Sequence, residues 1–179
     1  RDGVVNKEKN YLYKIEDFEF IEGVFETCNY FQDNGYIIII ITNQSGIARS
    51  KYTEKDFDIL NKWMIEKFTM KNINITKVYH CPHHPKYTGV CDCRKPKPGL
   101  FYDISQRLPV ELNSVIAVGD SLRDIQAAKI AGAFPVLVKT GKGKKTFQKN
   151  VGLENVPVYK DLSAVVDEML SGKLTNTTK

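Results

Sequence analysis

Three apolar runs recur along the chain without the regular polar interruptions of a half-exposed strand. They are Tyr36–Ile41, Val115–Val118 and Phe134–Val138, and Lys77–His80 is a shorter candidate of the same kind. A strand that is exposed on one face alternates apolar and polar residues, whereas a continuous run is typical of a strand that is buried on both faces of a parallel sheet. The pattern therefore predicts a buried parallel sheet that contains these four strands.

Helical patterns lie between the runs. Apolar residues at helical spacing follow Thr53, which forms the sequence signature of a capping box with Asp56. Strands that alternate with helices predict an α/β fold: a Rossmann-like parallel sheet with helices on both faces and no large cap domain. The predicted helices are Phe25–Asn34, one that begins at Thr53, Gly99–Arg107, Leu122–Ala131 and Leu162–Leu170.

Polar turns follow three of the predicted strands. They are Thr42–Ser45, Gly119–Asp124 and Lys139–Gly143. Because ligands of parallel sheets bind beyond the carboxyl ends of the strands, we expect these turns to share one rim. The run Gly141–Lys145 lacks the upstream glycine of a phosphate-binding P-loop, so we interpret it as a flexible basic loop.

Side chains at this rim have the chemistry of a magnesium and phosphate site. Asp120 stands directly at a strand end, and with Asp2 it offers the hard oxygen ligands that magnesium prefers. The alternative is that Asp120 caps the helix Leu122–Ala131. Asp124 could equally be a first-turn charge that interacts with the helix dipole. The backbone N–H groups of the turn that begins at Thr42 can bind a phosphate.

Four potential ligands of a soft metal lie close together in the middle of the chain. Cys81, His83, Cys91 and Cys93 supply three thiolates and one imidazole, the set that a closed, structural zinc site needs. The alternatives are scattered core residues or disulfides. Neither gives His83 a role, and Cys91 and Cys93 are too close in sequence for an ordinary disulfide. We therefore predict a zinc-binding loop insert.

Two cations come directly after the last of these ligands. Arg94 and Lys95 would be presented by the zinc loop, and their charges can clamp a phosphoryl group during its transfer. The fourth cysteine, Cys28, lies in an apolar helical stretch, where we expect a packed core thiol.

Composition narrows the class of protein. The 179 residues are 42% hydrophobic with a formal net charge of +5, which predicts one globular domain over residues 1–170 and a polar tail over residues 171–179. No apolar run reaches the length of a membrane span. Reduced thiols that hold zinc fit the cytoplasm. A zinc-stabilised module that binds nucleic acid stays an alternative, although the lysine clusters lack interleaved aromatic residues and such a module has no use for Asp120.

The combination of motifs resembles a known superfamily over nearly the whole chain. Arg1–Asn6, Thr42–Arg49, Cys81–Pro85, Cys91–Pro96 and Val118–Ser121 resemble the haloacid dehalogenase superfamily. Within it, the zinc loop and the Ser-Gly-Ile-Ala-Arg run are most similar to the heptose bisphosphate phosphatase family. The histidinol-phosphate phosphatases share the zinc loop and are the second choice.

The resemblance implies phosphomonoester hydrolysis through an aspartyl-phosphate. The implied substrate is a heptose 1,7-bisphosphate that loses its 7-phosphate, in the biosynthesis of nucleotide-activated heptose for lipopolysaccharide or surface glycans. Asp2 matches the acid/base and, through its carbonyl, a magnesium ligand, while Asp120 matches a second magnesium ligand. Thr42 and Lys95 match the groups that stabilise the phosphoryl oxygens. Small members without a cap are often monomers, so we expect a monomer.

The resemblance also implies a set of substrate contacts, with Arg94 in substrate recognition. The implied contacts are Glu8, Lys9, Asn10, Tyr11, Thr42, Asn43, Gln44, Ser45, Arg94, Lys95 and Ser121. The sequence departs from the family at Ser121, where some members have lysine. The family pattern is Asp-x-Asp-Gly and this sequence starts at x, so we expect an aspartate directly before Arg1 and an apolar strand before that.

Overall fold

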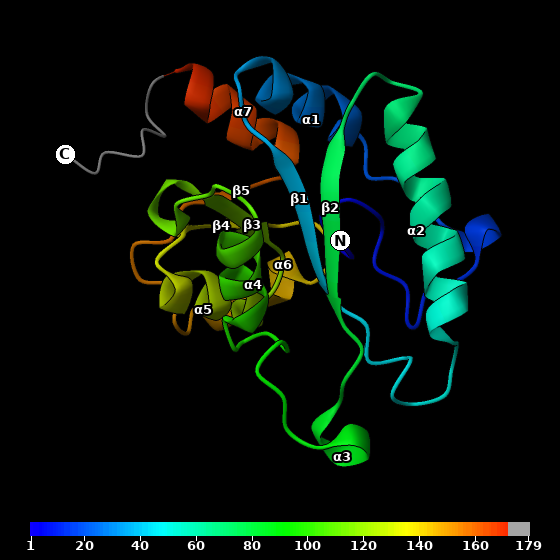
Figure 1. The fold of residues 1–179 in the computed structure, drawn as a ribbon. Coiled ribbons are helices and arrows are strands. Elements are labelled where there is room, and N and C mark those ends of the chain that lie inside the picture. The colour runs from blue at the N-terminus through cyan, green and yellow to red at the C-terminus, as the bar shows by residue number, and fades with distance from the viewer. Residues whose placement is uncertain (172–179) are drawn as a thin grey trace.

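All strands of the protein run parallel to their neighbours. The computed structural model describes residues 1–171. In it, β1 (Ile38–Asn43) pairs with β2 (Ile75–Cys81). A second sheet has the order β3 (Ile116–Gly119), β4 (Phe134–Val138) and β5 (Val158–Tyr159). The predicted parallel α/β fold is therefore confirmed, and β5 is a strand that sequence reasoning missed (Figure 1).

The helices alternate with these strands along the chain. Three of the predicted helices match residue for residue, at Gly99–Arg107, Leu122–Ala131 and Leu162–Leu170. Short 3-10 turns lie at Ile15–Asp17 and Leu112–Ser114. The α-helices are α1 (Val24–Asp33), α2 (Glu54–Thr69), α3 (Pro85–Thr88), α4 (Gly99–Arg107), α5 (Leu122–Ala131), α6 (Gly143–Lys149) and α7 (Leu162–Leu170).

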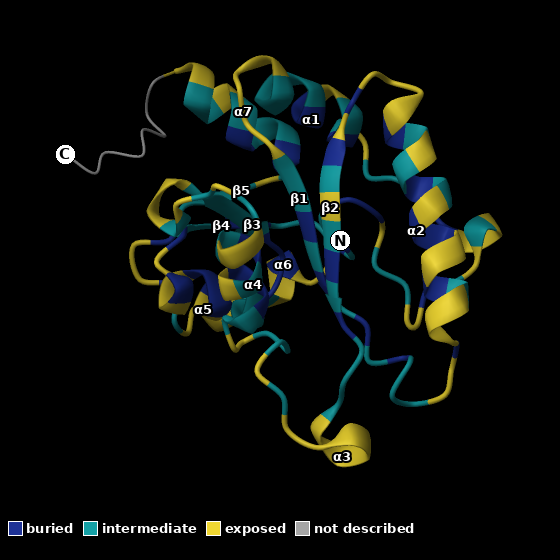
Figure 2. Ribbon diagram, in the orientation of Figure 1, coloured by how far each residue is buried: buried dark blue, intermediate teal, exposed yellow. Residues whose placement is uncertain are grey.

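Helices cover both faces of the strands. On one face, α1, α2 and α7 bury their apolar sides with Ile40 of β1 in a cluster that includes Phe68 and Leu162. On the other face, α4 and α5 pack against Ile41. Figure 2 shows the resulting stripes of buried residues on α2 and α5. Cys28 is a buried thiol in the first of these clusters, as predicted, and burial raises its pKa to about 12.

The prediction of a strand over Tyr36–Ile41 that is buried on both faces is wrong in two respects. The strand begins two residues later, at Ile38, and Ile37 is 52% exposed. Among the described residues, β1 pairs only with β2, and β3 pairs only with β4. The facing edges of β1 and β3 border an apolar groove of about 750 Å³, so the isoleucines on this side lack a neighbouring strand.

The prediction of a flexible basic loop at Gly141–Lys145 is also wrong. Helix α6 begins at Gly143, and the segment is fixed by hydrogen bonds from the Lys142 N–H and the Thr146 hydroxyl to Asp120, at 2.8 and 3.0 Å. A side chain at Gly143 would meet the Val138 carbonyl oxygen at 1.8 Å, so only glycine allows this close approach.

Of the predicted tail over residues 171–179, residues 172–179 lie outside the part that the structure describes. Among the described helices, none has the length and apolar character that crossing a bilayer requires.

Candidate active site

A polar cavity of about 230 Å³ opens at the carboxyl ends of β1 and β3. The three polar turns that were predicted to share a rim all contribute to it, through Thr42, Asp120 and Lys142. The structure therefore brings together segments that lie far apart in the sequence. The predicted catalytic, magnesium and substrate-contact residues that line the cavity are Asp2, Glu8, Lys9, Asn10, Tyr11, Thr42, Asn43, Gln44, Ser45, Arg94, Lys95, Asp120 and Ser121.

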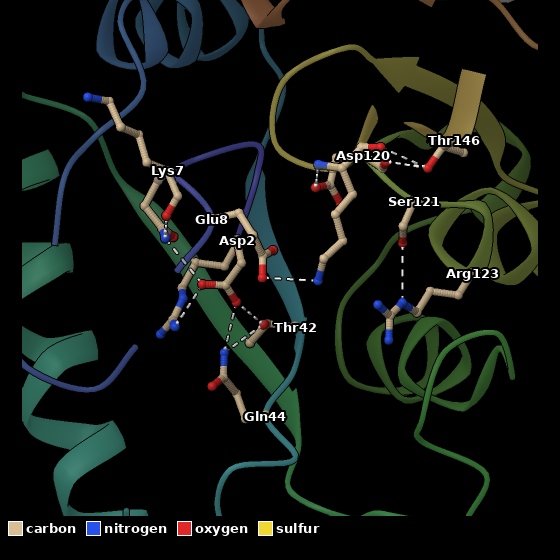
Figure 3. A network of polar contacts seen from close by, with 12 residues as sticks. Asp2, Lys7, Glu8, Thr42, Gln44, Asp120, Ser121, Arg123 and Thr146 are labelled. Atoms are coloured by element: carbon tan, nitrogen blue, oxygen red, sulfur yellow. Dashed lines mark hydrogen bonds and ion pairs between the residues drawn. The ribbon is translucent and has the colours of Figure 1, made fainter. Parts of the chain in front are cut away.

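Asp2 accepts hydrogen bonds on both carboxylate oxygens. Its Oδ1 accepts from Asn6 at 3.2 Å and from the Arg1 guanidinium at 3.1 Å. Its Oδ2 accepts from Gln44 at 3.2 Å and Thr42 at 3.4 Å, as Figure 3 shows. Burial raises the pKa of Asp2, but the charges of the Arg1 side chain and of the amino group of residue 1, together with the bond from Asn6, outweigh this and hold the pKa at about 2. Asp2 is therefore a pre-oriented carboxylate that is ionised at neutral pH.

Gln44 has a role that its motif did not reveal. It was predicted as a substrate contact, but its amide donates to Asp2 and, at 2.9 Å, to the Thr42 hydroxyl. The Tyr52 hydroxyl donates to the other end of the same amide. Burial raises the pKa of Tyr52 to about 12, so this donor keeps its proton. Gln44 therefore orients Asp2 and Thr42 from within the wall of the cavity.

Asp120 is buried with few partners. Only 4% of it is exposed, and its carboxylate accepts from the Lys142 N–H at 2.8 Å. A side chain at Gly3 or Gly141 would come within 1.9 or 2.2 Å of its Oδ2, so both glycines make room for this carboxylate. Burial raises the pKa of Asp120 to about 6. A divalent cation beside it would supply the missing charge, so the residue fits the magnesium role.

The alternative role for Asp120, as the cap of α5, is wrong. Ser121 is the N-cap, and it forms a capping box with Asp124. The Ser121 hydroxyl also donates to Asp124, so the side chain predicted to touch substrate is engaged in capping. Asp124 is more than a first-turn charge, because it also pairs with Lys95.

Lys95 sits in an ion pair that is largely shielded from solvent. Its Nζ lies 2.5 Å from Asp124 and donates to the Ile41 carbonyl at 3.2 Å. Burial raises the pKa of Asp124, but Lys95 outweighs this effect and holds the pKa at about 2. The Asn43 side chain, which is predicted as a substrate contact and lines the cavity, brackets the Lys95 backbone: it donates to the carbonyl at 3.0 Å and accepts from the N–H at 3.1 Å. These bonds fix Lys95 at the cavity.

The four predicted zinc ligands converge in space. Their ligand atoms all lie within 4.8 Å of one another. Cys93 Sγ is 2.9 Å from Cys81 Sγ, 3.5 Å from Cys91 Sγ and 3.4 Å from His83 Nδ1. Three sulfurs and one imidazole at these separations can surround a tetrahedral ion. Burial raises the pKa of the Cys81 thiol well above its usual range, a shift that a bound cation would reverse.

Two arginines form one part of the cavity wall. Arg94, which follows the cysteine cluster directly, donates to the His83 carbonyl at 3.0 Å. Arg123, in the first turn of α5, also lines the cavity and donates to the Ser121 hydroxyl at 3.3 Å. Sequence reasoning missed Arg123, because an arginine in a first helical turn carries no motif. Its one available signal was its place three residues after Asp120.

Comparison with known proteins agrees with this site. Residues 92–165 match the family model described as HAD-hydrolase-like. The chain is 47% identical over 127 residues to a D-glycero-alpha-D-manno-heptose-1,7-bisphosphate 7-phosphatase of Campylobacter jejuni, over 71% of this chain and 72% of that protein. It is 43% identical over 148 residues to the D-glycero-beta-D-manno-heptose-1,7-bisphosphate 7-phosphatase of Vibrio cholerae, over 79% of this chain and 80% of that one.

A solved structure is similar over almost the full chain. The D,D-heptose 1.7-bisphosphate phosphatase from B. bronchiseptica, complexed with magnesium and phosphate, superposes with a TM-score of 0.89 and is 35% identical, covering 96% of both chains. These relatives favour the heptose reading of the sequence over the histidinol-phosphate one. At these identities and coverages, the chain belongs to the heptose bisphosphate phosphatase family of haloacid dehalogenase-like hydrolases.

Proposed function

We propose that this protein hydrolyses the 7-phosphate of D-glycero-D-manno-heptose 1,7-bisphosphate, as a step toward nucleotide-activated heptose for lipopolysaccharide or surface glycans. The observation that supports this best is the cavity in which Asp2, Thr42, Lys95 and Asp120 meet, because these residues match the phosphatase motifs and come from separate segments. The names of the relatives supply the substrate.

The reaction passes through a covalent phospho-aspartate. In this family the nucleophile is an aspartate two positions before the acid/base residue, whose place Asp2 takes in this sequence. Its carboxylate oxygen bonds to phosphorus while the bond to the sugar oxygen breaks, and Asp2 gives that oxygen a proton. Asp2 then takes a proton from the water that attacks phosphorus, which releases phosphate and restores the carboxylate. A phosphate dianion close to Asp2 raises its pKa from about 2, so substrate binding itself favours the protonated acid.

Other residues of the cavity hold the phosphoryl group. The Lys95 ammonium and the Thr42 hydroxyl line the same cavity as Asp2 and contact the phosphoryl oxygens. The Asp120 carboxylate and the Asp2 carbonyl would hold magnesium, which neutralises charge on the transferring phosphoryl group. The raised pKa of Asp120, about 6, and its single backbone donor support this role, as does the magnesium in the B. bronchiseptica structure.

The cysteine cluster acts at a distance from the chemistry. Cys81, His83, Cys91 and Cys93 would hold zinc with no open coordination position, so the ion is structural. Its effect is to place Arg94 and Lys95, the two residues that follow Cys93, at the cavity. Substitution of Cys91 by serine should loosen this loop and lower activity indirectly.

Phosphate release with the full-length protein tests the proposal. Magnesium is supplied, and both anomers of heptose 1,7-bisphosphate are compared with histidinol phosphate. We expect one or both heptose anomers to be cleaved with a far higher kcat/KM than histidinol phosphate. Asp120→Asn, purified in parallel, controls for contaminating phosphatases. Cleavage of neither anomer, or a preference for histidinol phosphate, would overturn the proposal.

Two further expectations accompany this function. We propose that the protein acts in the cytoplasm, where thiols stay reduced and can hold zinc. We also propose that it works as a monomer, because the cavity is built from elements of one chain. Light scattering at working concentration would test the second expectation.

A further inference from the structure

Six cationic side chains line the cavity, and four of them are paired with an acidic side chain. Arg1 pairs with Asp2 at 3.1 Å, Lys9 with Glu19 at 2.8 Å, Lys95 with Asp124 at 2.5 Å and Lys142 with Glu8 at 3.0 Å. These pairs neutralise most of the positive charge of the cavity.

Arg94 and Arg123 differ from these four cations in their ion pairing. Within residues 1–171, no carboxylate lies within ion-pairing distance of either guanidinium. Each instead makes one hydrogen bond to a neutral oxygen, which leaves the other N–H groups of its planar fork free to donate. In Figure 3, the Arg123 side chain extends from α5 toward the side of the view on which Thr42 and Asp2 lie.

Both guanidiniums line the same cavity. Two like charges held at one wall without a counter-ion are costly, and an anion between them would remove the cost. The fork of an arginine matches the oxygens of a phosphate, which it can bind with two parallel hydrogen bonds.

We propose that Arg123 joins Arg94 in binding the second, non-reacting phosphate of the substrate. This inference rests on the proposed function, which places the reacting phosphate at Asp2 and Lys95. Arg123 then determines specificity: it selects a sugar that carries a phosphate at each end. It disfavours a phosphomonoester whose far end carries an ammonium or imidazolium group, because that end would meet two arginines.

Kinetics on two substrates test the inference. Arg123→Gln and Arg123→Lys are compared with the wild type on heptose 1,7-bisphosphate and on heptose 7-phosphate, which lacks the second phosphate. We expect Arg123→Gln to lower kcat/KM for the bisphosphate by roughly tenfold to a hundredfold, mainly through a higher KM. The kcat/KM for the monophosphate should not change. Arg123→Lys keeps the charge but loses the planar guanidinium, so its kcat/KM for the bisphosphate should lie between those of the wild type and Arg123→Gln. An equal loss on both substrates, or no loss on either, overturns the inference.

A matched control addresses non-specific effects of removing an arginine. Arg107→Gln removes an exposed arginine at the end of α4 that pairs with Asp103 and does not line the cavity. Its kinetics on both substrates should equal those of the wild type. Melting temperatures of all variants show whether each one still folds. If Arg123→Gln does not fold, the comparison of Arg123→Lys with the wild type still tests the inference.

A binding measurement separates this inference from the proposed function. Calorimetry with heptose 1-phosphate, the expected product, needs no turnover. If the wild type binds it and Arg123→Gln binds it at least tenfold more weakly, the phosphate subsite stands even if the bisphosphate is not cleaved. If the wild type cleaves the bisphosphate but Arg123→Gln binds the 1-phosphate equally well, the function stands and this inference fails.

Discussion

The two sides of the cavity hold their carboxylates in opposite ways. At the end of β1, Asp2 is surrounded by donors and a guanidinium, and its pKa is about 2. At the end of β3, Asp120 is buried with one backbone donor from Lys142, and its pKa is about 6. The protein itself neutralises the first carboxylate, whereas the second lacks a cation. These opposite environments match the roles proposed above, proton transfer for Asp2 and magnesium binding for Asp120.

Substitution of Asp120 should have the largest effect, because it removes the carboxylate that is proposed to bind magnesium. Asp120→Asn is expected to abolish magnesium-dependent phosphate release while the fold is kept. Magnesium should also raise the melting temperature of the wild type and fail to raise that of the variant, because only a state that binds the ion gains stability from it. Full activity in Asp120→Asn would show that this side of the cavity needs no ion.

Substitution of Lys95 should have the next largest effect. Its ammonium group joins the loop before α4 to Asp124 on α5 through an ion pair. Lys95→Met leaves Asp124 largely shielded from solvent without its cation, which should lower the free energy of unfolding by about 3–5 kcal/mol. Chemical denaturation of wild type and variant at neutral pH measures this difference in unfolding free energy. Lys97→Met breaks a more exposed pair with Asp92 and should change stability little. Equal effects of the two substitutions would contradict a buried, essential pair.

The same pair predicts an acid-dependent loss of stability. The folded-state pKa of Asp124, about 2, lies below its usual value of 3.8. Its contribution to stability is therefore complete above about pH 4 and is lost as pH falls toward 2. The gap in unfolding free energy between wild type and Asp124→Asn should shrink across this window, by on the order of 2 kcal/mol. A gap that stays constant from pH 5 to pH 2 would contradict the assignment.

The smallest expected effect concerns the fine orientation of Asp2. Gln44→Leu removes the amide that joins Asp2, Thr42 and the Tyr52 hydroxyl. It should cost about 1 kcal/mol in transition-state stabilisation, seen as a loss in kcat of roughly fivefold, and the magnesium-dependent rise in melting temperature should stay intact. If Gln44→Leu also abolished that rise, the two sides of the cavity would not be independent.

Local signals made much of this fold predictable. Helix α5 was predicted residue for residue because Gly132, which ends it in the left-handed conformation, is a local stop signal, although its N-cap is Ser121 and not the Asp120 that the sequence suggested. The cysteine cluster was predictable because the ligand types and spacing identify a metal site whatever the surrounding fold. The start of α6 within the basic segment was not predictable, because glycine and lysine in a short run indicate a turn. The close approach of Gly143 to Val138 is a contact between segments that the sequence does not show.

Long-range pairs were not predictable from sequence. The Lys95–Asp124 ion pair and the Asn43 bracket on the Lys95 backbone join segments that meet only in the folded chain. The motifs could name Lys95 and Asn43, but they could not show that the Asn43 side chain bonds the Lys95 backbone. Likewise, nothing local to Arg123 indicated that it would line the same cavity as Arg94.

The bracket that Asn43 places on Lys95 has a practical use in protein engineering. It ties the base of the metal-ligand loop to β1, while the loop tip around α3 extends into solvent and Val90 is 78% exposed (Figure 2). A substitution at the loop tip should therefore leave the position of the loop base unchanged. A single cysteine cannot be labelled there selectively beside the cluster thiols, but an unnatural amino acid at Val90 could carry a fluorophore that reports loop order during metal removal.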